Sequence, residues 1–268
     1  MIAKNLFDAS KTDYRLWEED EGSTLIHYYP AKVKKGDAAI VIFPGGGYHH
    51  RAIHEGQGYA EHFAELGLDS FVVDYRVTPN HFPLPLLDAR RGVRFVRYYA
   101  EKFGINPDKV AVMGSSAGGH LSALVSTYKN AIDGVGVDEI DEISPIPNSQ
   151  ILCYPVINMV DAVIGHRPSA INLLGEDNLD FAPSVSPDLI ADESTPDAFI
   201  WHTANDNGVH VKNSYTFAGV LRNFNVPVEM HIFPYGNHGL GLAPDMPNTV
   251  GQWAPLMDNW LRAKGWVE

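Results

Sequence analysis

Short apolar runs alternate along this chain with longer segments of helical period. The runs lie at residues 25–29, 38–43, 70–74, 109–113, 150–154, 198–202 and 228–233. Several of them are apolar nearly throughout, which is typical of strands buried on both faces of a parallel sheet. Parallel strands need a long crossover between them, so this alternation restricts the chain to few folds.

Segments with apolar residues at three- and four-residue steps fill the intervals. They lie at residues 55–66, 85–103, 117–128, 210–224 and 250–261. The first stops at Gly67 and the second at Gly104, and glycine supplies the left-handed residue that ends many helices. Repeated strand–helix–strand units form right-handed crossovers. The sequence therefore predicts an α/β fold with a mostly parallel, doubly wound sheet and helices on both faces.

Residues 156–196 break this rhythm. This stretch of 41 residues contains several prolines and no long periodic run. A segment of that length inside a compact domain is usually an excursion rather than a plain connection. We therefore expect a single domain over residues 1–268, with a cap- or lid-like insertion at about 156–196.

Composition argues against several classes of partner. The chain has 268 residues and a formal net charge of −13, whereas nucleic acids and anionic membranes attract clusters of Lys and Arg. No apolar run approaches the roughly 18 residues of a membrane span, and the N-terminal residues contain no apolar secretory region. The single cysteine, Cys153, lies in an apolar run and is expected in the core. These features predict a cytoplasmic protein without a disulfide.

The sequence Gly114-Ser-Ser-Ala-Gly118-Gly follows one apolar run directly and precedes a helical segment. A G-x-S-x-G pattern in this strand–turn–helix context presents a nucleophilic serine at a helix N-terminus. Only Ser116, and not Ser115, has glycines two residues away on both sides, where a Cβ atom would collide with the tight turn. A turn of this kind could instead bind a phosphate, but both phosphate-binding glycine spacings are absent.

A serine hydroxyl attacks an ester only when a base and an orienting acid assist it. In this fold class the partners follow in the order Ser, Asp or Glu, His, each after a later strand. Asp206 is the only acid in the loop of residues 203–209, and His238 lies in a glycine-containing loop after the last strand. Ser116, Asp206 and His238 are therefore the predicted catalytic residues.

Other histidines and acids are less suitable. His202 and His231 fall inside strand runs, where we expect satisfied core or sheet-face residues. His120 lies on the helix after the serine and is expected to pack or to form hydrogen bonds. Asp197 enters its strand at the wrong end of the sheet, and Asp161 lies in the insertion.

Four stretches, FPGGGY, GSSAGGHL, HTANDNGV and FPYGNHGLGL, resemble the α/β-hydrolase superfamily. More narrowly, they resemble the esterase/lipase group often labelled acetyl-xylan-esterase-like or sugar hydrolase. The similarity runs from about Ala38 to Leu261. In that family the elbow serine, the acid of the HT-x-x-D loop and the late histidine form the triad, which implies Ser116, Asp206 and His238 here.

The resemblance also gives a role to the glycines of FPGGGY. Related esterases carry His-Gly-Gly-Gly at this place, and two of these glycines with the residue after the nucleophile form the oxyanion hole. Gly46, Gly47 and Ala117 are the residues that this implies here. Glycine backbone can approach a substrate carbonyl closely, and each such N–H is worth roughly 10²–10³ in rate. Pro44 stands where many relatives have histidine, so the loop must be anchored differently.

The stretch HHRAIHE contains residue types that bind metals, namely His49, His50, His54 and Glu55. It lacks the H-E-x-x-H spacing, and adjacent histidines rarely converge on one ion. A solvated loop followed by a glutamate that opens a helix explains it without a metal. Tyr48 and His49 are expected to be walls of the substrate pocket.

Together these features predict a serine hydrolase of carboxylic esters that needs no cofactor and no metal. The resemblance implies short acyl groups, including acetyl esters of sugars, with the insertion covering the site. The expected partner is a small-molecule ester. A peptidase or amidase of the same fold and a non-catalytic binding protein are the alternatives. Glycosidic cleavage would need a pair of carboxylates about 5–10 Å apart, and nothing in the sequence places such a pair.

Overall fold

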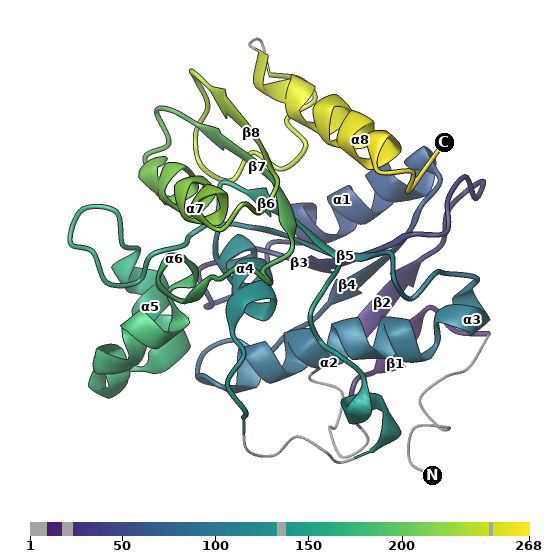
Figure 1. The fold of residues 1–268 in the computed structure, drawn as a ribbon, viewed down its shortest axis with the longest axis horizontal. Coiled ribbons are helices and arrows are strands. Elements are labelled where there is room, and N and C mark those ends of the chain that lie inside the picture. Colours follow the sequence, from purple (N-terminus) through teal and green to yellow (C-terminus); the bar gives the residue numbers. More distant parts are fainter. Residues whose placement is uncertain (1–9, 18–23, 133–137, 247–248) are drawn as a thin grey trace.

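The computed structural model describes residues 10–17, 24–132, 138–246 and 249–268. Its described residues form a twisted eight-stranded sheet in the order β1-β2-β4-β3-β5-β6-β7-β8 (Figure 1). The strands are β1 (Asp13–Arg15), β2 (Leu25–Tyr29), β3 (Ala39–Phe43), β4 (Asp69–Val73), β5 (Val110–Ser115), β6 (Ser149–Cys153), β7 (Asp197–Thr203) and β8 (Val228–Phe233).

The strands from β4 to β8 in the spatial order run parallel, and β1 and β2 pair antiparallel at one edge. After β3 the chain passes to β4 on one side and then returns to β5 on the other. Such a reversal leaves a crevice at the carboxyl ends of the two central strands, where ligands bind in open α/β sheets. Phe43 of β3 lies opposite Gly114 of β5, so the loops that follow both strands start side by side.

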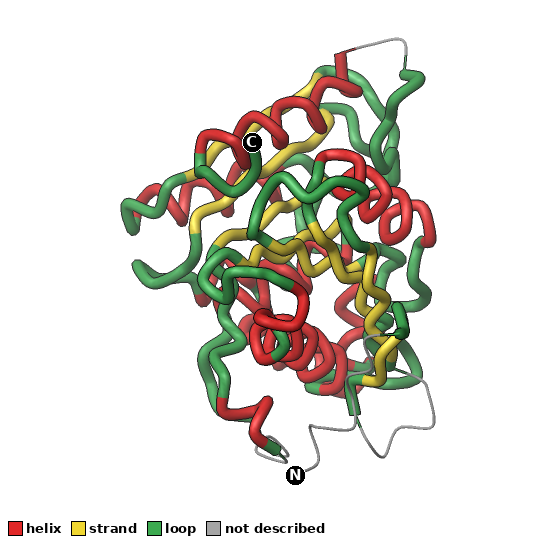
Figure 2. Tube along the Cα trace, turned by 90° about the vertical axis from the view of Figure 1, so that its right-hand side faces the viewer, coloured by secondary structure: helices red, strands yellow, loops and turns green. Residues whose placement is uncertain are grey.

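Helices cover both faces of the sheet, and Figure 2 shows the strands between them. The apolar side chains of α1 (Ile53–Leu66) and α8 (Trp253–Ala263) pack on one face, with Ile40 and Ile42 of β3. Those of α2 (Leu84–Tyr98) and α4 (Ala117–Thr127) pack on the other, with Val41. α7 (Lys212–Asn223) also contributes to the core on the side of α4. The predicted doubly wound sheet is thereby confirmed.

Residues 156–196 fold into short helices near α4 (Figure 1). They are α5 (Arg167–Leu174), η3 (Glu176–Val185) and α6 (Pro187–Ile190). Buried polar side chains hold the segment in place, since Asn213 of α7 accepts two of its backbone N–H groups at 2.9 Å. None of the helices in the described part of the chain is long and apolar enough to cross a membrane.

Two predicted helices differ from those observed. The segment 85–103 is divided at Tyr99, whose φ of −97° and ψ of 14° separate α2 from α3 (Ala100–Phe103). The last helix starts with a 3₁₀ turn, η4 (Thr249–Gln252), before α8. Another 3₁₀ turn, η2 (Glu139–Glu142), precedes β6. The apolar pattern continues across both breaks, so periodicity could not reveal them.

The close approach of α4 to β3 gives a test of this packing. A Cβ atom on Gly118 would lie 2.0 Å from the carbonyl oxygen of Phe43 and 2.6 Å from that of Pro44. We expect Gly118→Ala to lower the free energy of unfolding by about 3 kcal/mol or more, because backbone must move to admit the methyl group. Urea denaturation measures this.

The matched control is Gly219→Ala on α7, where a Cβ atom would meet nothing within 4 Å. Alanine replaces glycine in an open helix position there, so stability should rise by up to about 1 kcal/mol. Equal effects of the two substitutions would contradict the packing described.

Candidate active site

Ser116 lies at the sharp turn between β5 and α4. Its φ of 54° and ψ of −118° are strained for a residue with a side chain, and such strain persists only where the surroundings impose it. A Cβ atom on Gly114 would lie 2.1 Å from the carbonyl oxygen of Gly118, so the turn requires glycine at these positions. The Ser116 N–H donates to the carbonyl of Cys153 on β6 at 3.0 Å. The turn is therefore held from both sides.

Three side chains from the ends of different strands meet here. His238 Nε2 lies 2.8 Å from Ser116 Oγ, and His238 Nδ1 lies 2.8 Å from Asp206 Oδ2. The carboxylate accepts a hydrogen bond from Nδ1–H. Nε2 therefore carries no proton and can accept the proton of the serine hydroxyl. The structure thus brings all three predicted residues into the geometry of a nucleophile, a base and an orienting acid. Their part in a reaction stays a prediction.

Asp206 is held rigidly in this arrangement. Its Oδ1 accepts the N–H groups of Gly208 and Val209 at 2.8 and 2.9 Å, and its side chain is 1% exposed. Burial alone would raise the pKa of the carboxyl. Hydrogen bonds from His202 and His238, with the charge of His238, more than offset burial and hold that pKa well below its usual range. Asp206 is therefore ionised in the folded protein near neutral pH.

His202 takes part in this site, although the sequence indicated only a core or sheet-face residue. Its buried ring donates from Nε2 to the carbonyl of Val209 at 3.0 Å, and Nδ1 lies 2.8 Å from Ser214 Oγ. The same Nε2 lies 3.3 Å from Asp206 Oδ2. The expected core environment is confirmed, and the ring also supports the acid. The sequence signal for this role was that His202 precedes Asp206 by four residues, at the end of β7.

The glycine loop after β3 has an unusual backbone. Gly46 and Gly47 have φ values of 125° and 64°, and the Gly46 carbonyl accepts N–H groups from His49 and His50 at 3.0 and 3.2 Å. Among the described residues, the N–H groups of Gly46 and Gly47 donate no hydrogen bond to another protein group. Ala117, the first residue of α4, belongs to the helix end where N–H groups lack helical partners. These donors remain the predicted oxyanion hole.

Tyr48 points into the protein, so the expectation that it is a wall of the substrate pocket is wrong. Its side chain is fully buried, and its hydroxyl lies 2.7 Å from His120 Nδ1. His120 Nε2 donates to the carbonyl of Val185 at 2.7 Å, so Nδ1 carries no proton and accepts a hydrogen bond from the Tyr48 hydroxyl. Burial lowers the pKa of His120 to about 4, which keeps the ring neutral. His120 is a hydrogen-bonding residue, as predicted.

Pro44 is anchored without a histidine. Its carbonyl accepts a hydrogen bond from the Tyr75 hydroxyl at 2.6 Å. The proline ring packs closely on α1, because a Cβ atom on Gly56 would lie only 2.9 Å from Pro44 Cγ. Arg51, at the far end of the glycine loop, donates to the Tyr75 carbonyl at 2.8 Å. The segment after β4 therefore holds both ends of the loop.

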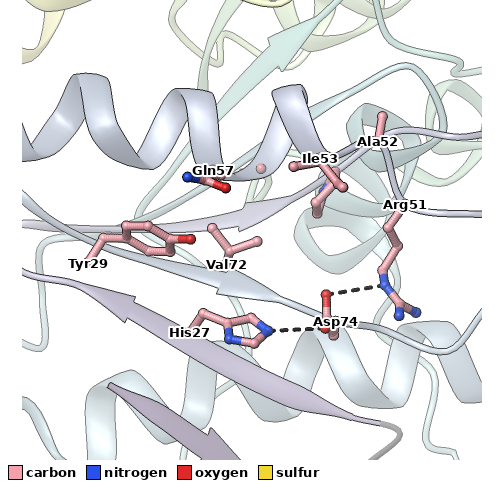
Figure 3. Close-up of a pocket in the computed structure, with 10 residues that line it drawn as sticks. His27, Tyr29, Arg51, Ala52, Ile53, Gln57, Val72 and Asp74 are labelled. Carbon is pink, nitrogen blue, oxygen red and sulfur yellow. Dashed lines mark hydrogen bonds and ion pairs between the residues drawn. The ribbon is translucent and has the colours of Figure 1, made fainter. Parts of the chain in front are cut away.

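Beside Pro44 lies a cavity of about 300 Å³ with a chain of charged groups on one wall (Figure 3). The Asp74 carboxylate lies 3.2 Å from Arg51 Nε and 3.1 Å from His27 Nε2. His27 Nδ1 also lies 2.7 Å from Asp13 Oδ1. The hydrogen bond with Asp74, assisted by that with Asp13, outweighs burial and raises the pKa of His27 to about 9. The charges on this wall thus neutralise one another and fix Arg51.

Glu55 connects the glycine loop to the loop of His238. It lies in the first turn of α1, as expected, but is only 3% exposed, and it accepts the Gly45 N–H at 3.0 Å and the Tyr154 hydroxyl at 2.6 Å. The Tyr154 hydroxyl accepts the Gly241 N–H at 3.0 Å, and its ring meets that of His238 edge-on at 5.1 Å. Sequence reasoning missed this network, because its members lie far apart along the chain.

The eight-stranded, mostly parallel sheet with helices on both faces has the α/β-hydrolase fold. Residues 26–221 match the BD-FAE family, and the chain belongs to it.

Three known proteins illustrate the similarity. A crystal structure of an acetyl ester-xyloside bifunctional hydrolase from Caldicellulosiruptor lactoaceticus is 38% identical, with a TM-score of 0.87 over 95% of this chain and 96% of that one. Acetylxylan esterase from Xylanibacter ruminicola is 34% identical over 100% of this chain and 53% of its own length. Endo-1,4-beta-xylanase B from Butyrivibrio fibrisolvens is 34% identical over 89% of this chain and 39% of its own length. The chain thus spans about half or less of these two curated relatives.

The Glu55 network predicts a cost for removing one hydroxyl. Tyr154→Phe removes the hydrogen bond that Glu55 Oε1 accepts and leaves the buried Gly241 N–H without its acceptor. We expect the free energy of unfolding to fall by about 1.5–3 kcal/mol, measured by urea denaturation. Tyr98→Phe removes an exposed hydroxyl that bonds to Glu139 at 3.3 Å and should change stability by less than about 0.5 kcal/mol. An equally small effect at Tyr154 would show that the network is unimportant.

The raised pKa of His27 predicts that the folded protein loses stability at alkaline pH. Its pKa is raised from 6.5 to about 9 in the folded protein, so its contribution is complete below pH 6.5 and is lost as the pH rises through 9. Between pH 6.5 and 9.5 the unfolding free energy of the wild type should therefore fall more than that of His27→Gln. Urea unfolding at both pH values measures the difference. Parallel curves would contradict the assignment, and His49→Gln on the exposed glycine loop is the control.

Proposed function

We propose that this chain hydrolyses carboxylic esters through an acyl-enzyme. The observation that carries the proposal is the continuous chain of 2.8 Å contacts from Ser116 Oγ through His238 to Asp206. Family membership supports it, since the relatives named above include an acetylxylan esterase and an acetyl ester hydrolase.

Ser116 Oγ attacks the acyl carbon while its proton passes to His238 Nε2. Asp206 keeps Nδ1 protonated and stabilises the imidazolium that forms. When the tetrahedral intermediate collapses, the ester C–O bond breaks and His238 returns the proton to the leaving alcohol. Water then attacks the acyl-enzyme with His238 again as base, which releases the acid and restores Ser116.

The negative charge of the intermediate is stabilised by backbone. The N–H groups of Gly46, Gly47 and Ala117 are the proposed donors. The positive φ values of the two glycines expose their peptides, and the Glu55 and Tyr75 contacts hold the neighbouring residues 44 and 45. Donors fixed in this way need no reorganisation during the reaction, which is the main advantage of an oxyanion hole.

Short acyl esters, and acetyl esters of sugars among them, are the proposed substrates. The names of the acetylxylan esterase and of the acetyl ester-xyloside hydrolase support this choice. In the proposed enzyme, residues 156–196 form a cap over the site within a single domain. Glycosidic cleavage is not proposed, because Asp206 is already occupied by His202, His238 and two backbone N–H groups.

Ser116→Ala tests the mechanism directly. We expect hydrolysis of p-nitrophenyl acetate to fall about 10⁴-fold or more, because the nucleophile is absent, and labelling by a fluorophosphonate probe to disappear. Wild-type turnover should be the same with and without EDTA. Steady-state kinetics, gel fluorescence and circular dichroism measure activity, labelling and folding.

Ser122→Ala is the matched control on the same helix. The Ser122 hydroxyl is buried without a hydrogen-bond partner in the described structure, so activity should stay within about twofold of wild type. Activity that survives Ser116→Ala, or that EDTA abolishes, would reject the mechanism.

A further inference from the structure

Helix α5 of the cap lies against the glycine loop. Asn172 Nδ2 donates to the carbonyl of Gly47 at 2.8 Å, and Ser169 Oγ lies 4.0 Å from the position that a Cβ atom on Gly47 would occupy. The chain around His81 and Phe82 also holds the C-terminal end of α5, since Phe82 N–H donates to the carbonyl of Leu173. Helix α5 is therefore held at the rim of the proposed oxyanion hole, with Ser169 of its first turn near Gly47.

His166 is the N-cap residue of α5 and has a defined tautomer. The Ser169 N–H donates to His166 Nδ1 at 3.3 Å, and Ser169 Oγ lies 2.8 Å from the same nitrogen. A nitrogen that accepts a backbone N–H carries no proton, so the ring is neutral with its proton on Nε2. This Nε2–H donates to no described residue, and the side chain is half-buried.

The ring lies near the glycine loop, because His166 Nδ1 lies 2.8 Å from Ser169 Oγ, and that oxygen lies 4.0 Å from the position of a Cβ atom on Gly47. Burial, and next the charge of His238, lower the pKa of His166, whereas Asp206 raises it. A neutral imidazole thus presents an unused donor at Nε2 near the rim of the proposed oxyanion hole.

We propose that His166 is a specificity residue whose Nε2–H donates a hydrogen bond to a hydroxyl or ring oxygen of the alcohol half of a sugar ester. Three features carry it: the contact of α5 with Gly47, the occupied Nδ1, and the free donor at Nε2. The inference rests on the proposed esterase function. A site that donates to a substrate hydroxyl discriminates against esters that lack one, since the donor is then left unpaired.

The alternative is that His166 does no more than cap α5. Two substitutions separate these roles. His166→Asn keeps a side-chain acceptor at the N-cap, where asparagine is among the preferred residues, but removes the distal N–H. His166→Gln keeps a distal N–H but is a poor cap. Stability follows the cap, whereas specificity follows the distal donor.

The experiment compares kcat/KM for two acetyl esters. One is a monoacetylated methyl xyloside, whose alcohol carries hydroxyls and a ring oxygen, and the other is p-nitrophenyl acetate, whose alcohol carries neither. For His166→Asn we expect about a tenfold or greater loss on the xyloside acetate, with p-nitrophenyl acetate within about twofold and an unchanged Tm. For His166→Gln we expect a lower Tm and a smaller loss on the xyloside acetate.

The control is His81→Asn, which changes another half-buried histidine that contacts α5, with Nδ1 3.0 Å from the Asn172 carbonyl. It should leave the ratio of the two kcat/KM values unchanged. An unchanged ratio in His166→Asn, or an equal loss on both esters, would overturn the assignment, as would a wild-type enzyme that hydrolyses only p-nitrophenyl acetate. A wild type inactive on both esters would instead reject the esterase function itself.

Discussion

The contact of two backbones organises this site. The first turn of α4 passes so close to the end of β3 that a methyl group on Gly118 would overlap the carbonyl of Phe43. This proximity places the strained Ser116 turn beside the glycine loop, so the proposed nucleophile and the proposed backbone donors lie side by side. It is possible because β3 and β5 are neighbours at the reversal of strand order. The other contacts of the site adjust around this fixed approach.

Buried polar groups then set the loops relative to that contact. Glu55 ties the glycine loop to the Tyr154 hydroxyl and through it to the loop of His238, while Tyr75 and Arg51 hold the ends of the glycine loop. Hydrogen bonds to a buried carboxylate are stronger than neutral ones. A proline can therefore replace the histidine found in many relatives, because other side chains supply the anchors.

Local pattern and motif order predicted the sheet, the serine turn and the meeting of Asp206 with His238, since each depends on a strand and the loop after it. Burial of Glu55 and the inward direction of Tyr48 could not be predicted, because they depend on partners 99 and 72 residues away. The division of a predicted helix at Tyr99 could not be predicted either, because the apolar spacing continues across it. Short-range signals thus located the proposed chemistry, whereas tertiary contacts decide how it is supported.

The neutral His120 has a consequence for residues 156–196, the proposed cap. It bonds on one side to Tyr48 of the glycine loop and on the other to the Val185 carbonyl, which ends η3. Lifting the cap would strip two buried groups of their partners, at a cost of about 1–3 kcal/mol for each. The segment is thus better suited to act as a fixed wall than as a gate. In the proposed esterase, the shape of a fixed wall rather than a timed closure would then limit the length of the acyl chain.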